Sequence, residues 1–367
     1  MSRPRVFVPQ PIPEVGLARL REFSDVEVWP YMHRAISVPE LGSAVARSDY
    51  LLGWPHSMPI TKSMIEANPN LRGIAVHEIP NTSGANLRKD LEGVAAAREA
   101  GIAFLVPPRA PQPPEDAGGR GYPWPDYALN PRCTSDLLVG LVLNLAYRIV
   151  EADKYCRGTG YFQEQTMAFM GQGCTGKTVA LWGLGKVARH AVRKFRALDM
   201  DVVYNKRTRL DKEDEEELGV EWVGETDALI SMADYLCMLV NFEPSNTKLM
   251  GEREFGLMKP TAYFINVGRG RLVDEEAMVR ALQDRTIAGA GLDVFWEEPP
   301  VVLAAHIPDA LRKLDNVVLT PHNGGATHDS RGRGALSLAN VIVDDIIRRQ
   351  RAGHVAEPAA LRPRPSP

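Results

Sequence analysis

The chain has no long apolar segment of the kind that crosses or enters a membrane. No apolar run in the 367 residues reaches the roughly 18 that span a bilayer, and the opening MSRPRVFVPQP lacks the apolar core of a signal peptide. We therefore expect a cytoplasmic protein. The formal net charge is only −3, which gives no argument for nucleic acid or an anionic membrane as a partner, and we expect neither.

Cysteine is sparse, and its spacing fits no metal site. The four cysteines lie 23, 18 and 63 residues apart along the chain, with no CxxC pair and no set of histidines nearby. In a reducing compartment such cysteines are free thiols, so we predict no metal site. Cys237 falls in an apolar run and is expected to be buried in a strand.

The most informative stretch that is present is TVALWGLGKVA, residues 178–188. An apolar, β-branched run stops at two glycines and turns into a helical pattern, with Ala188 at the third position of a glycine fingerprint. Such a turn brings backbone N–H groups and a helix N-terminus close to a pyrophosphate. A plain tight turn is the alternative, since paired glycines after a strand are common. The expected cofactor contacts here are Gly183, Leu184, Gly185, Lys186 and Val187.

Runs typical of strands lie on both sides of the glycine turn and predict two parallel sheets. After the turn, a helix is expected over 186–198 and strands over 201–204, 233–240, 262–267, 287–295 and 316–320. Before it, strands at 5–8, 26–29, 50–53, 71–76 and 102–106 alternate with helices at 14–23, 38–46, 61–67 and 88–99. The expected fold class is α/β, with two doubly wound parallel-sheet domains.

The two sheets are separated by a segment, 107–131, so rich in proline and glycine that no long helix or strand is expected in it. A long apolar helix follows over 134–155, with Thr134 or Ser135 as its N-cap. A helix over 333–351 has the periodicity to pack elsewhere, and we expect it to return to the first domain. The tail, 353–367, is expected to be disordered.

The residues after the second strand of the later sheet indicate which dinucleotide fits. An acidic residue about 20 positions past the glycines usually binds the ribose 2′-hydroxyl, and that position is Asn205 here. Lys206, Arg207 and Arg209 stand beside it and suit a 2′-phosphate, so NADP (as NADPH) is favoured and NAD is the alternative cofactor. A solvated basic loop is the other interpretation. Thr208 completes the contacts expected in this run.

Three polar side chains follow ends of strands in the second half of the chain. Arg269 follows the strand ending at Val267, and Glu298 and His322 follow the next two strands. Because ligands of open α/β sheets bind at the carboxyl ends of strands, these side chains can meet in one crevice. Arginine can hold a carboxylate and polarise a keto oxygen, and a histidine paired with a glutamate can protonate an alkoxide. The set suits hydride transfer to a 2-keto acid, although each residue alone also fits an ordinary surface position.

Four blocks, GLGKVA, INVGRGRLVDEEAM, GLDVFWEEP and LTPH, occur in this order between residues 183 and 322. They resemble the signature blocks of the D-2-hydroxyacid dehydrogenase family, which includes phosphoglycerate dehydrogenase and glyoxylate/hydroxypyruvate reductase. The resemblance is strong over residues 134–345. It implies catalytic roles for Arg269, Glu298 and His322, and it gives Asp293 the role of orienting the nicotinamide carboxamide.

The resemblance also implies a domain plan and a homodimer formed through the cofactor domains. An NADP-binding Rossmann domain over 134–321 would be inserted in a discontinuous, flavodoxin-like substrate domain made of 1–133 and 322–352. NADP-preferring members of the family carry a basic residue where Arg207 stands. Further cofactor contacts are expected at later strand ends, at Val240, Asn241, Val267, Gly268, His322 and Gly324.

The chain departs from the family where the substrate carboxylate is expected. The family commonly has a segment of the type GVGxDNID after the fourth strand, whereas this chain reads VHEIPNTSGANLRKDLEG, and its 107–131 segment is longer than the family's. If both segments line the cleft, small keto acids should be poor substrates and a larger or more polar 2-oxo acid should be preferred. Surface loops without substrate contact are the alternative. The candidate substrate contacts are Trp54, His56, His77, Asn81, Thr82, Ser83 and Arg132.

The leading hypothesis is an NADPH-dependent reductase that converts a small-molecule 2-keto acid to a D-2-hydroxy acid. A specialised biosynthetic dehydrogenase for an unusual 2-oxo acid is the alternative among enzymes. From another class, a dinucleotide-sensing binding protein, similar to the corepressors that resemble this family, fits the same motifs because such proteins can keep the catalytic residues. Turnover of keto acids separates the two classes.

Overall fold

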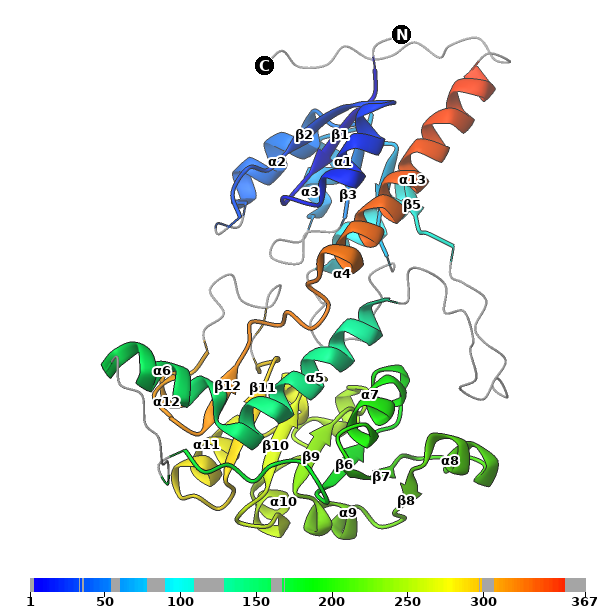
Figure 1. Ribbon diagram of the computed structural model, residues 1–367. Helices are drawn as coiled ribbons and strands as arrows, with labels where there is room; N and C mark the ends of the chain where they lie inside the picture. The colour runs from blue at the N-terminus through cyan, green and yellow to red at the C-terminus, as the bar shows by residue number, and fades with distance from the viewer. Residues whose placement is uncertain are drawn as a thin grey trace. The chain divides into compact units, whose positions relative to one another are not determined.

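The computed structural model describes residues 3–32, 34, 36–53, 60–77, 90–108, 129–159, 167, 169–296, 298 and 307–353. These residues form two compact units (Figure 1). The first unit takes in the described residues up to 108 and those from 328 onward, and the second takes in those from 129 to 298 and from 307 to 327. Each unit is built around a parallel β-sheet.

The first unit contains a five-stranded sheet in the order β2-β1-β3-β4-β5. All of its strand pairs are parallel, and Val6 of β1 pairs with Val26 on one side and Tyr50 on the other. This is the flavodoxin-like strand order. The strands are β1 (Arg5–Val8), β2 (Asp25–Val28), β3 (Tyr50–Leu52), β4 (Gly73–Ala75) and β5 (Ala103–Leu105).

Helices cover both faces of this sheet because alternate residues of each strand point to opposite sides. Val6 and Val8 pack in one apolar cluster with residues of α1 and α13, whereas Phe7 packs in another with residues of α2, α3 and α4. The predicted return of the C-terminal helix to the first unit is therefore confirmed, although α13 begins five residues earlier than expected. The helices are α1 (Glu14–Arg21), α2 (Val38–Ala46), α3 (Lys62–Glu66), α4 (Asp90–Glu99) and α13 (His328–Gly353).

The second unit contains a seven-stranded parallel sheet in the order β12-β11-β10-β9-β6-β7-β8. Counted from β6, this is the Rossmann order 3-2-1-4-5-6 with one more strand, so the predicted fold class of two doubly wound parallel sheets is confirmed. The point at which the strand order reverses lies between β6 and β9. The strands are β6 (Thr178–Trp182), β7 (Asp201–Asn205), β8 (Glu221–Trp222), β9 (Tyr235–Met238), β10 (Tyr263–Asn266), β11 (Gly289–Leu292) and β12 (Val317–Leu319).

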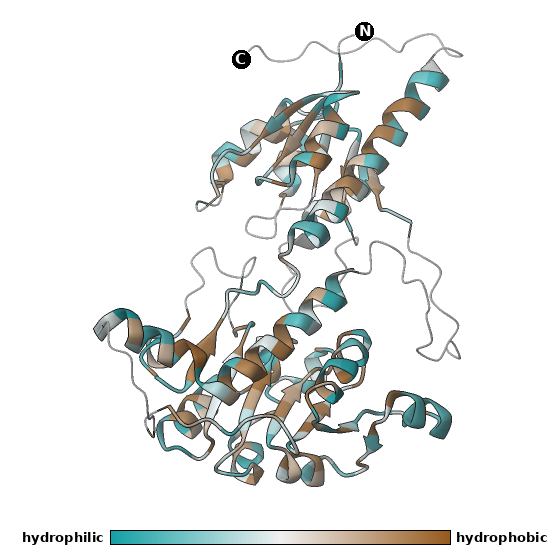
Figure 2. Cartoon of the chain, viewed as in Figure 1, coloured by the Kyte–Doolittle hydropathy of each residue, from teal (hydrophilic) through white to brown (hydrophobic). Residues whose placement is uncertain are grey.

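Two apolar clusters form the core of the second unit, one on each face of its sheet. Residues of α5 and α7 pack on one face, and residues of α9, α10 and α11 pack on the other. Figure 2 shows the strands mostly in brown and α8, whose sequence is KEDEEEL, in teal. The helices are α5 (Leu129–Tyr147), α6 (Ile149–Thr159), α7 (Lys186–Arg196), α8 (Lys212–Leu218), α9 (Thr226–Met232), α10 (Glu252–Leu257), α11 (Glu275–Gln283) and α12 (Asp309–Arg312), with 3-10 turns η2 (Pro244–Asn246) and η3 (Gly270–Leu272).

The single helix predicted over 134–155 is wrong, because the chain forms two helices there. α5 ends at Tyr147 and α6 begins at Ile149. Arg148 between them has a φ of 52°, a left-handed conformation that interrupts the helical hydrogen bonding. The apolar periodicity continues across this residue, which is why the sequence pattern did not reveal the break.

The predicted start of that helix is also wrong. α5 begins at Leu129, inside the segment for which no long helix was expected, and Pro131 stands in its first turn, where a missing N–H is tolerated. Thr134 and Ser135 are therefore not N-caps. Their hydroxyls donate to the carbonyls of Asn130 and Arg132, one turn earlier in the same helix.

In the part of the chain that the structure describes, no single helix is long and apolar enough to cross a membrane. The pair Asn130–Tyr147 and Ile149–Thr159 meets that requirement only when both parts are counted together, across a bend of 61°. Leu138 and Val142 of α5 are buried in the core of the second unit.

Residues 322–327 belong to the second unit, whereas the family resemblance implied that 322 onward belongs to the substrate domain. Two contacts explain the difference. The N–H of Gly324 donates to the carboxylate of Asp293, and the Thr327 hydroxyl lies 3.2 Å from the thiol of Cys133. This stretch is therefore attached to the seven-stranded sheet and its first helix, and the other expected domain borders stay a prediction.

Candidate active site

The residues predicted to bind cofactor or to act in catalysis lie at one edge of the seven-stranded sheet. Because all its strands are parallel, their carboxyl ends share that edge, where ligands of such sheets bind. The residues divide among the strands as follows: the glycine turn follows β6, Asn205 to Thr208 end and follow β7, Val240 and Asn241 follow β9, Val267 to Arg269 follow β10, Asp293 and Glu298 follow β11, and His322 and Gly324 follow β12.

The glycine turn after β6 has the geometry expected of a phosphate-binding turn. Gly183 has a φ of 103°, and a Cβ there would lie 2.6 Å from the carbonyl carbon of Leu239, so only glycine permits this close approach. Gly185 is the N-cap of α7 without a side-chain cap, and nothing lies within 4 Å of where its Cβ would be. The open helix start leaves backbone N–H groups for an anion. In this turn Leu184 is buried, Lys186 is exposed and Val187 is half-buried.

The loop after β7 presents cations and no carboxylate at the ribose position. The side-chain amide of Asn205 donates to the carbonyls of Val223 and Gly224, at 2.7 and 3.0 Å, so it supports the backbone. Lys206 is half-buried, and burial, helped by the nearby Arg189, lowers its pKa. Arg207 is 86% exposed and forms an ion pair of 3.2 Å with Glu243. Thr208 is exposed.

Arg209 does not belong with the other cations of this loop. Its guanidinium forms two hydrogen bonds, of 2.9 and 2.8 Å, with the buried carboxylate of Glu215 on α8. The Tyr204 hydroxyl donates to the same carboxylate at 2.6 Å. The expectation that Arg209 would help to bind a 2′-phosphate is therefore not supported, because its donors already serve the packing of α8.

Arg269 is positioned by Asn266, a residue that the sequence pattern did not single out. Asn266 is buried at the end of β10; its Oδ1 accepts from the N–H of Gly268 at 3.0 Å, and its Nδ2 donates to the Arg269 carbonyl at 3.1 Å. The Arg269 side chain is exposed and donates to the Gly268 carbonyl at 2.7 Å. A buried asparagine in the apolar run YFIN is the signal that could have revealed this turn.

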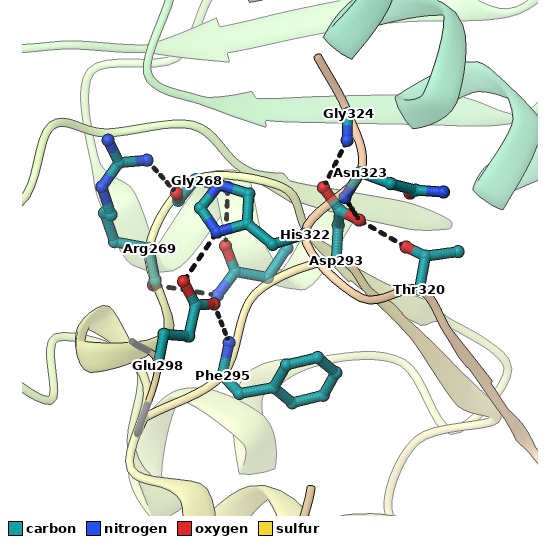
Figure 3. Close-up of polar contacts among 10 residues, drawn as sticks. Gly268, Arg269, Asp293, Phe295, Glu298, Thr320, His322, Asn323 and Gly324 are labelled. Carbon is teal, nitrogen blue, oxygen red and sulfur yellow. Dashed lines mark hydrogen bonds and ion pairs between the residues drawn. The ribbon is translucent and has the colours of Figure 1, made fainter. Parts of the chain in front are cut away.

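Figure 3 shows Glu298 and His322 side by side, with Arg269 in the same group of side chains. The imidazole Nδ1 lies 2.6 Å from Oε2 of Glu298. The other carboxylate oxygen accepts the backbone N–H of Phe295 at 2.7 Å. Since Glu298 is held through both oxygens, it fixes the orientation of the imidazole ring.

The loop that carries His322 is anchored to the sheet through Asp293. The buried carboxylate of Asp293 accepts from the Thr320 hydroxyl at 2.6 Å and from the N–H groups of Asn323 and Gly324 at 2.9 and 3.0 Å. His322 between these anchors has a φ of 54°, a left-handed conformation that few non-glycine residues adopt. Thr320 lies in the LTPH block and Asn323 directly follows it, but the block did not show that either residue bonds to Asp293.

The pairing with Glu298 raises the pKa of His322. The hydrogen bond to that carboxylate is the main cause, and the charges of Glu298 and Asp293 act in the same direction. Burial of the imidazole and the positive charge of Arg269 both lower the pKa and so oppose the shift. The effect of Arg269 means that its charge lies within electrostatic range of the imidazole. The ring therefore retains its proton to a higher pH than a free histidine.

Most of the candidate substrate residues lie outside the described residues. These are Trp54, His56, Asn81, Thr82 and Ser83, together with most of the 107–131 segment. His77 is described and exposed; its Nε2 would lie 3.3 Å from a Cβ on Gly334 of α13, within the first unit. Arg132 is exposed in the first turn of α5, and its carbonyl accepts from the Ser135 hydroxyl.

The cysteines of the described chain are free, and none lies in this site. Cys237 is buried in β9, as predicted, and burial raises the pKa of its thiol. Among the described residues, no group of three or more His, Cys, Asp or Glu side chains is arranged to hold a metal ion.

Comparison with known proteins assigns the chain to a family. The model of the D-isomer specific 2-hydroxyacid dehydrogenase NAD binding domain matches residues 139–324. A Staphylococcus aureus (strain bovine RF122 / ET3-1) protein, named as belonging to the 2-hydroxyacid dehydrogenases, is 34% identical over 346 residues, covering 93% of this chain and 96% of the relative. The chain is a D-2-hydroxyacid dehydrogenase family member.

Solved structures of related proteins have the same architecture. A Thermus thermophilus protein is 27% identical and superposes with a TM-score of 0.71, with 94% of this chain and 97% of that chain covered. An NADPH-dependent glyoxylate/hydroxypyruvate reductase from Sinorhizobium meliloti, solved with NADP and malonate, is 25% identical, with a TM-score of 0.62 and coverage of 96% and 94%.

Membership of the 2-hydroxyacid dehydrogenases indicates a nicotinamide dinucleotide cofactor, and the geometry of the sheet edge fits one. The uncapped start of α7 and the open space beside Gly185 suit the pyrophosphate. The matched range, 139–324, includes Arg269, Glu298 and His322.

Proposed function

We propose that the protein is an NADPH-preferring reductase that converts a 2-keto acid into a D-2-hydroxy acid. The contact between His322 and Glu298, at the sheet edge that also carries Arg269 and the glycine turn, is the observation that carries this proposal. The bound cofactor supplies a hydride to the keto carbon. The residues of the chain then have to hold the substrate, polarise its carbonyl group and deliver one proton.

His322 is the proposed acid. Its Nδ1 faces Glu298, so Nε2 is the ring nitrogen that can meet the keto oxygen. The proton moves from Nε2 to that oxygen as the alkoxide charge develops, which leaves a neutral imidazole. Glu298 keeps the ring charged before the step, because its hydrogen bond raises the pKa of His322.

Arg269 is the proposed carboxylate anchor. Its guanidinium is exposed at the same edge and has a planar set of donors that matches a carboxylate. Its bond to the Gly268 carbonyl can be exchanged for bonds to substrate without disturbing the turn, since Asn266 holds the turn through the backbone. Asp293 is expected to reach the nicotinamide carboxamide while its oxygens also anchor the His322 loop.

The preference for NADPH rests on the loop after β7. Asn205 places no negative charge at the ribose position, and Lys206 and Arg207 lie beside it. The Sinorhizobium meliloti relative, which is NADPH-dependent by its description, supports the same preference. Val240, Asn241, Val267, Gly268 and Gly324 are the remaining proposed cofactor contacts, each at a strand end of this edge.

Steady-state kinetics with Arg207→Ala test the cofactor preference. A charge-assisted hydrogen bond is worth about 1.5 to 3 kcal/mol, so NADPH binding should weaken by about ten- to hundredfold while NADH binding changes little. An equal loss with both cofactors would remove Arg207 from the 2′-phosphate site.

His322→Ala tests the reaction itself. General acid catalysis contributes about 10² to 10⁴-fold, so turnover of 2-keto acids should fall by that order while NADPH affinity is kept. His328→Ala, on α13, is the matched control and should retain activity. A fully active His322→Ala protein would exclude the histidine from the mechanism.

Two other functions are compatible with the same site. A specialised biosynthetic dehydrogenase would turn over only an unusual 2-oxo acid, and a corepressor-like binding protein would bind the dinucleotide without turnover. A panel of 2-keto acids, followed by nicotinamide absorbance, separates them: glyoxylate or pyruvate turned over efficiently would favour an ordinary reductase. The preference for a larger or more polar 2-oxo acid stays a prediction.

We further propose that the chain forms a homodimer through its second unit. Tyr147 and Ile149, on either side of the helix break, are 57% and 49% exposed, and Met170 is 60% exposed. Met170 directly precedes Gly171, which packs against the end of α5. Ile149→Asp should shift the sedimentation coefficient toward that of a monomer, and Val38→Asp in the first unit should not. A cytoplasmic location stays a prediction.

A further inference from the structure

We propose that Glu243 sets the strength of the NADPH preference by competing with the 2′-phosphate for Arg207. The inference rests on the proposed use of Arg207 as a 2′-phosphate ligand, and it identifies a second residue that controls the same subsite. Glu243 is no part of the glycine or catalytic motifs; it lies in the loop after β9, and its ion pair with Arg207 links it to the proposed cofactor site.

The Arg207–Glu243 pair joins two loops that lie on opposite sides of β6. Arg207 follows β7, Glu243 follows β9, and both strands pair with β6. The glycine turn lies between these loops, and Gly183 packs directly on the backbone of Leu239. The ribose end of a dinucleotide has to lie beside the end of β7. The pair therefore spans the position at which a 2′-phosphate would meet Arg207.

Glu243 is held at this position by its own loop. The backbone N–H of Glu243 donates to Oδ1 of Asn246 at 2.8 Å. Nδ2 of the same asparagine side chain donates to the Asn241 carbonyl at 2.8 Å. The N–H of Asn246 also donates to the Glu243 carbonyl, which closes the 3-10 turn η2. The backbone of Glu243 is thus fixed, and its side chain, 49% exposed, stays within reach of Arg207.

The neighbouring charges make Glu243 the acid that a 2′-phosphate has to displace. Lys206 lies close to Arg189, and Arg189 is paired with Asp214 of α8 at 3.4 Å. Asp214 therefore balances Arg189 on the α8 side of the loop. Glu243, in the loop after β9, instead forms the ion pair with Arg207. NADH can bind with the Arg207–Glu243 pair intact. When NADPH binds, its 2′-phosphate replaces the Glu243 carboxylate as the partner of Arg207 and lies close to that carboxylate.

Glu243→Gln is the direct test, with dissociation constants measured for NADPH and NADH by fluorescence. Exposed ion pairs have small energies, so NADPH should bind about two- to fivefold more tightly, with a smaller change for NADH. The gain should shrink as salt is raised, because both the pair and the repulsion are screened. Asp315→Asn is the matched control: it removes one carboxylate from an exposed pair with Arg285, before β12 at the opposite sheet edge, and should leave both constants unchanged.

A double variant shows whether the effect passes through Arg207. In an Arg207→Ala background, Glu243→Gln cannot release Arg207 for the 2′-phosphate and removes only the repulsion between the carboxylate and the phosphate. The gain in NADPH affinity should therefore be smaller than with Arg207 present, so the effects of the two changes should be non-additive. An unchanged NADPH constant in Glu243→Gln, or an equal gain for both dinucleotides, would overturn the inference.

The outcomes for the two proposals differ. If the unsubstituted protein binds NADH and NADPH alike but Glu243→Gln binds NADPH more tightly, the proposed preference fails and the role of Glu243 stands. If the unsubstituted protein prefers NADPH and Glu243→Gln changes nothing, the preference stands and the role of Glu243 fails.

Discussion

His322 Nδ1 lies 2.6 Å from Oε2 of Glu298, while Oε1 of the same carboxylate accepts the N–H of Phe295. The backbone therefore holds the carboxylate through Oε1, and Oε2 orients the imidazole. A shift of the Phe295 backbone would move the histidine, so the proposed catalytic pair depends on the turn that follows β11.

We expect the pH dependence of keto acid reduction to report on this pair. The acid must be protonated to act, so turnover is high below the pKa of His322 and falls as the pH rises through it. Glu298→Gln removes the main cause of the raised pKa, and the falling limb should move to lower pH. The measurement is the pH profile of kcat/KM. A limb that stays in place would mean that another group donates the proton.

Asp293 should matter for stability as well as for activity. Asp293→Ala leaves the buried N–H of Gly324 and the partly buried N–H of Asn323 without their acceptor, and an unsatisfied buried donor costs about 1 to 3 kcal/mol. We expect the free energy of unfolding in urea to fall by about 2 to 4 kcal/mol. Thr320→Val removes only the hydroxyl contact and should cost about 1 kcal/mol. Equal losses in the two variants would contradict the anchoring role of the backbone contacts.

Gly270→Ala should lower turnover although it removes no polar side chain. A Cβ at this position would overlap the carbonyl group of Phe295, which is backbone and cannot rotate away. The Arg269 turn and the Glu298 segment would be forced apart, and a displacement of about 1 Å can cost about 10²-fold in turnover. Gly256→Ala, where nothing lies within 4 Å of the added Cβ, is the control for kinetics and should retain activity. Full activity in Gly270→Ala would show that the two segments separate freely.

Arg209→Ala should separate stability from cofactor choice. Its guanidinium holds the pKa of Glu215 below the usual value, and without it we expect a lower free energy of unfolding at neutral pH. Because the folded pKa is lowered, this difference is present above the unfolded pKa of glutamate and is lost as the pH falls through the folded pKa. Unfolding curves at several pH values measure it. The ratio of NADPH to NADH affinity should stay unchanged, and a change like that of Arg207→Ala would return Arg209 to the phosphate site.

The sequence was sufficient for elements with strong local signals. The strand at Arg5–Val8 consists of valine and phenylalanine after its first residue, and the helix at Val38–Ala46 begins with Ser37 and Glu40 in a capping box. Both elements have the predicted bounds. The two-residue strand β8 has too little sequence for any periodicity, and it was not predicted. The break at Arg148 was missed because a single left-handed residue leaves the apolar pattern unchanged.

The site was predictable to the extent that topology determines it. Arg269, Glu298 and His322 follow strand ends, and a parallel sheet brings such ends together. The contact between Glu298 and His322 was expected, whereas their other partners depend on side-chain directions that the chain order does not encode. Arg207 and Arg209 are alike in sequence, yet one pairs with Glu243 of another loop and the other with the buried Glu215.

The C-terminal helix α13 imposes an order on the folding of the newly made chain. Leu338, Ile342 and Ile346 belong to the same apolar cluster as Val6 and Leu17, near the start of the chain. A ribosome adds Ile346 only after it has added every residue of the second unit, which ends at 327. The seven-stranded sheet can therefore begin to fold before α13 is made, whereas the sheet that is made first has only α1 on one of its faces until α13 is available.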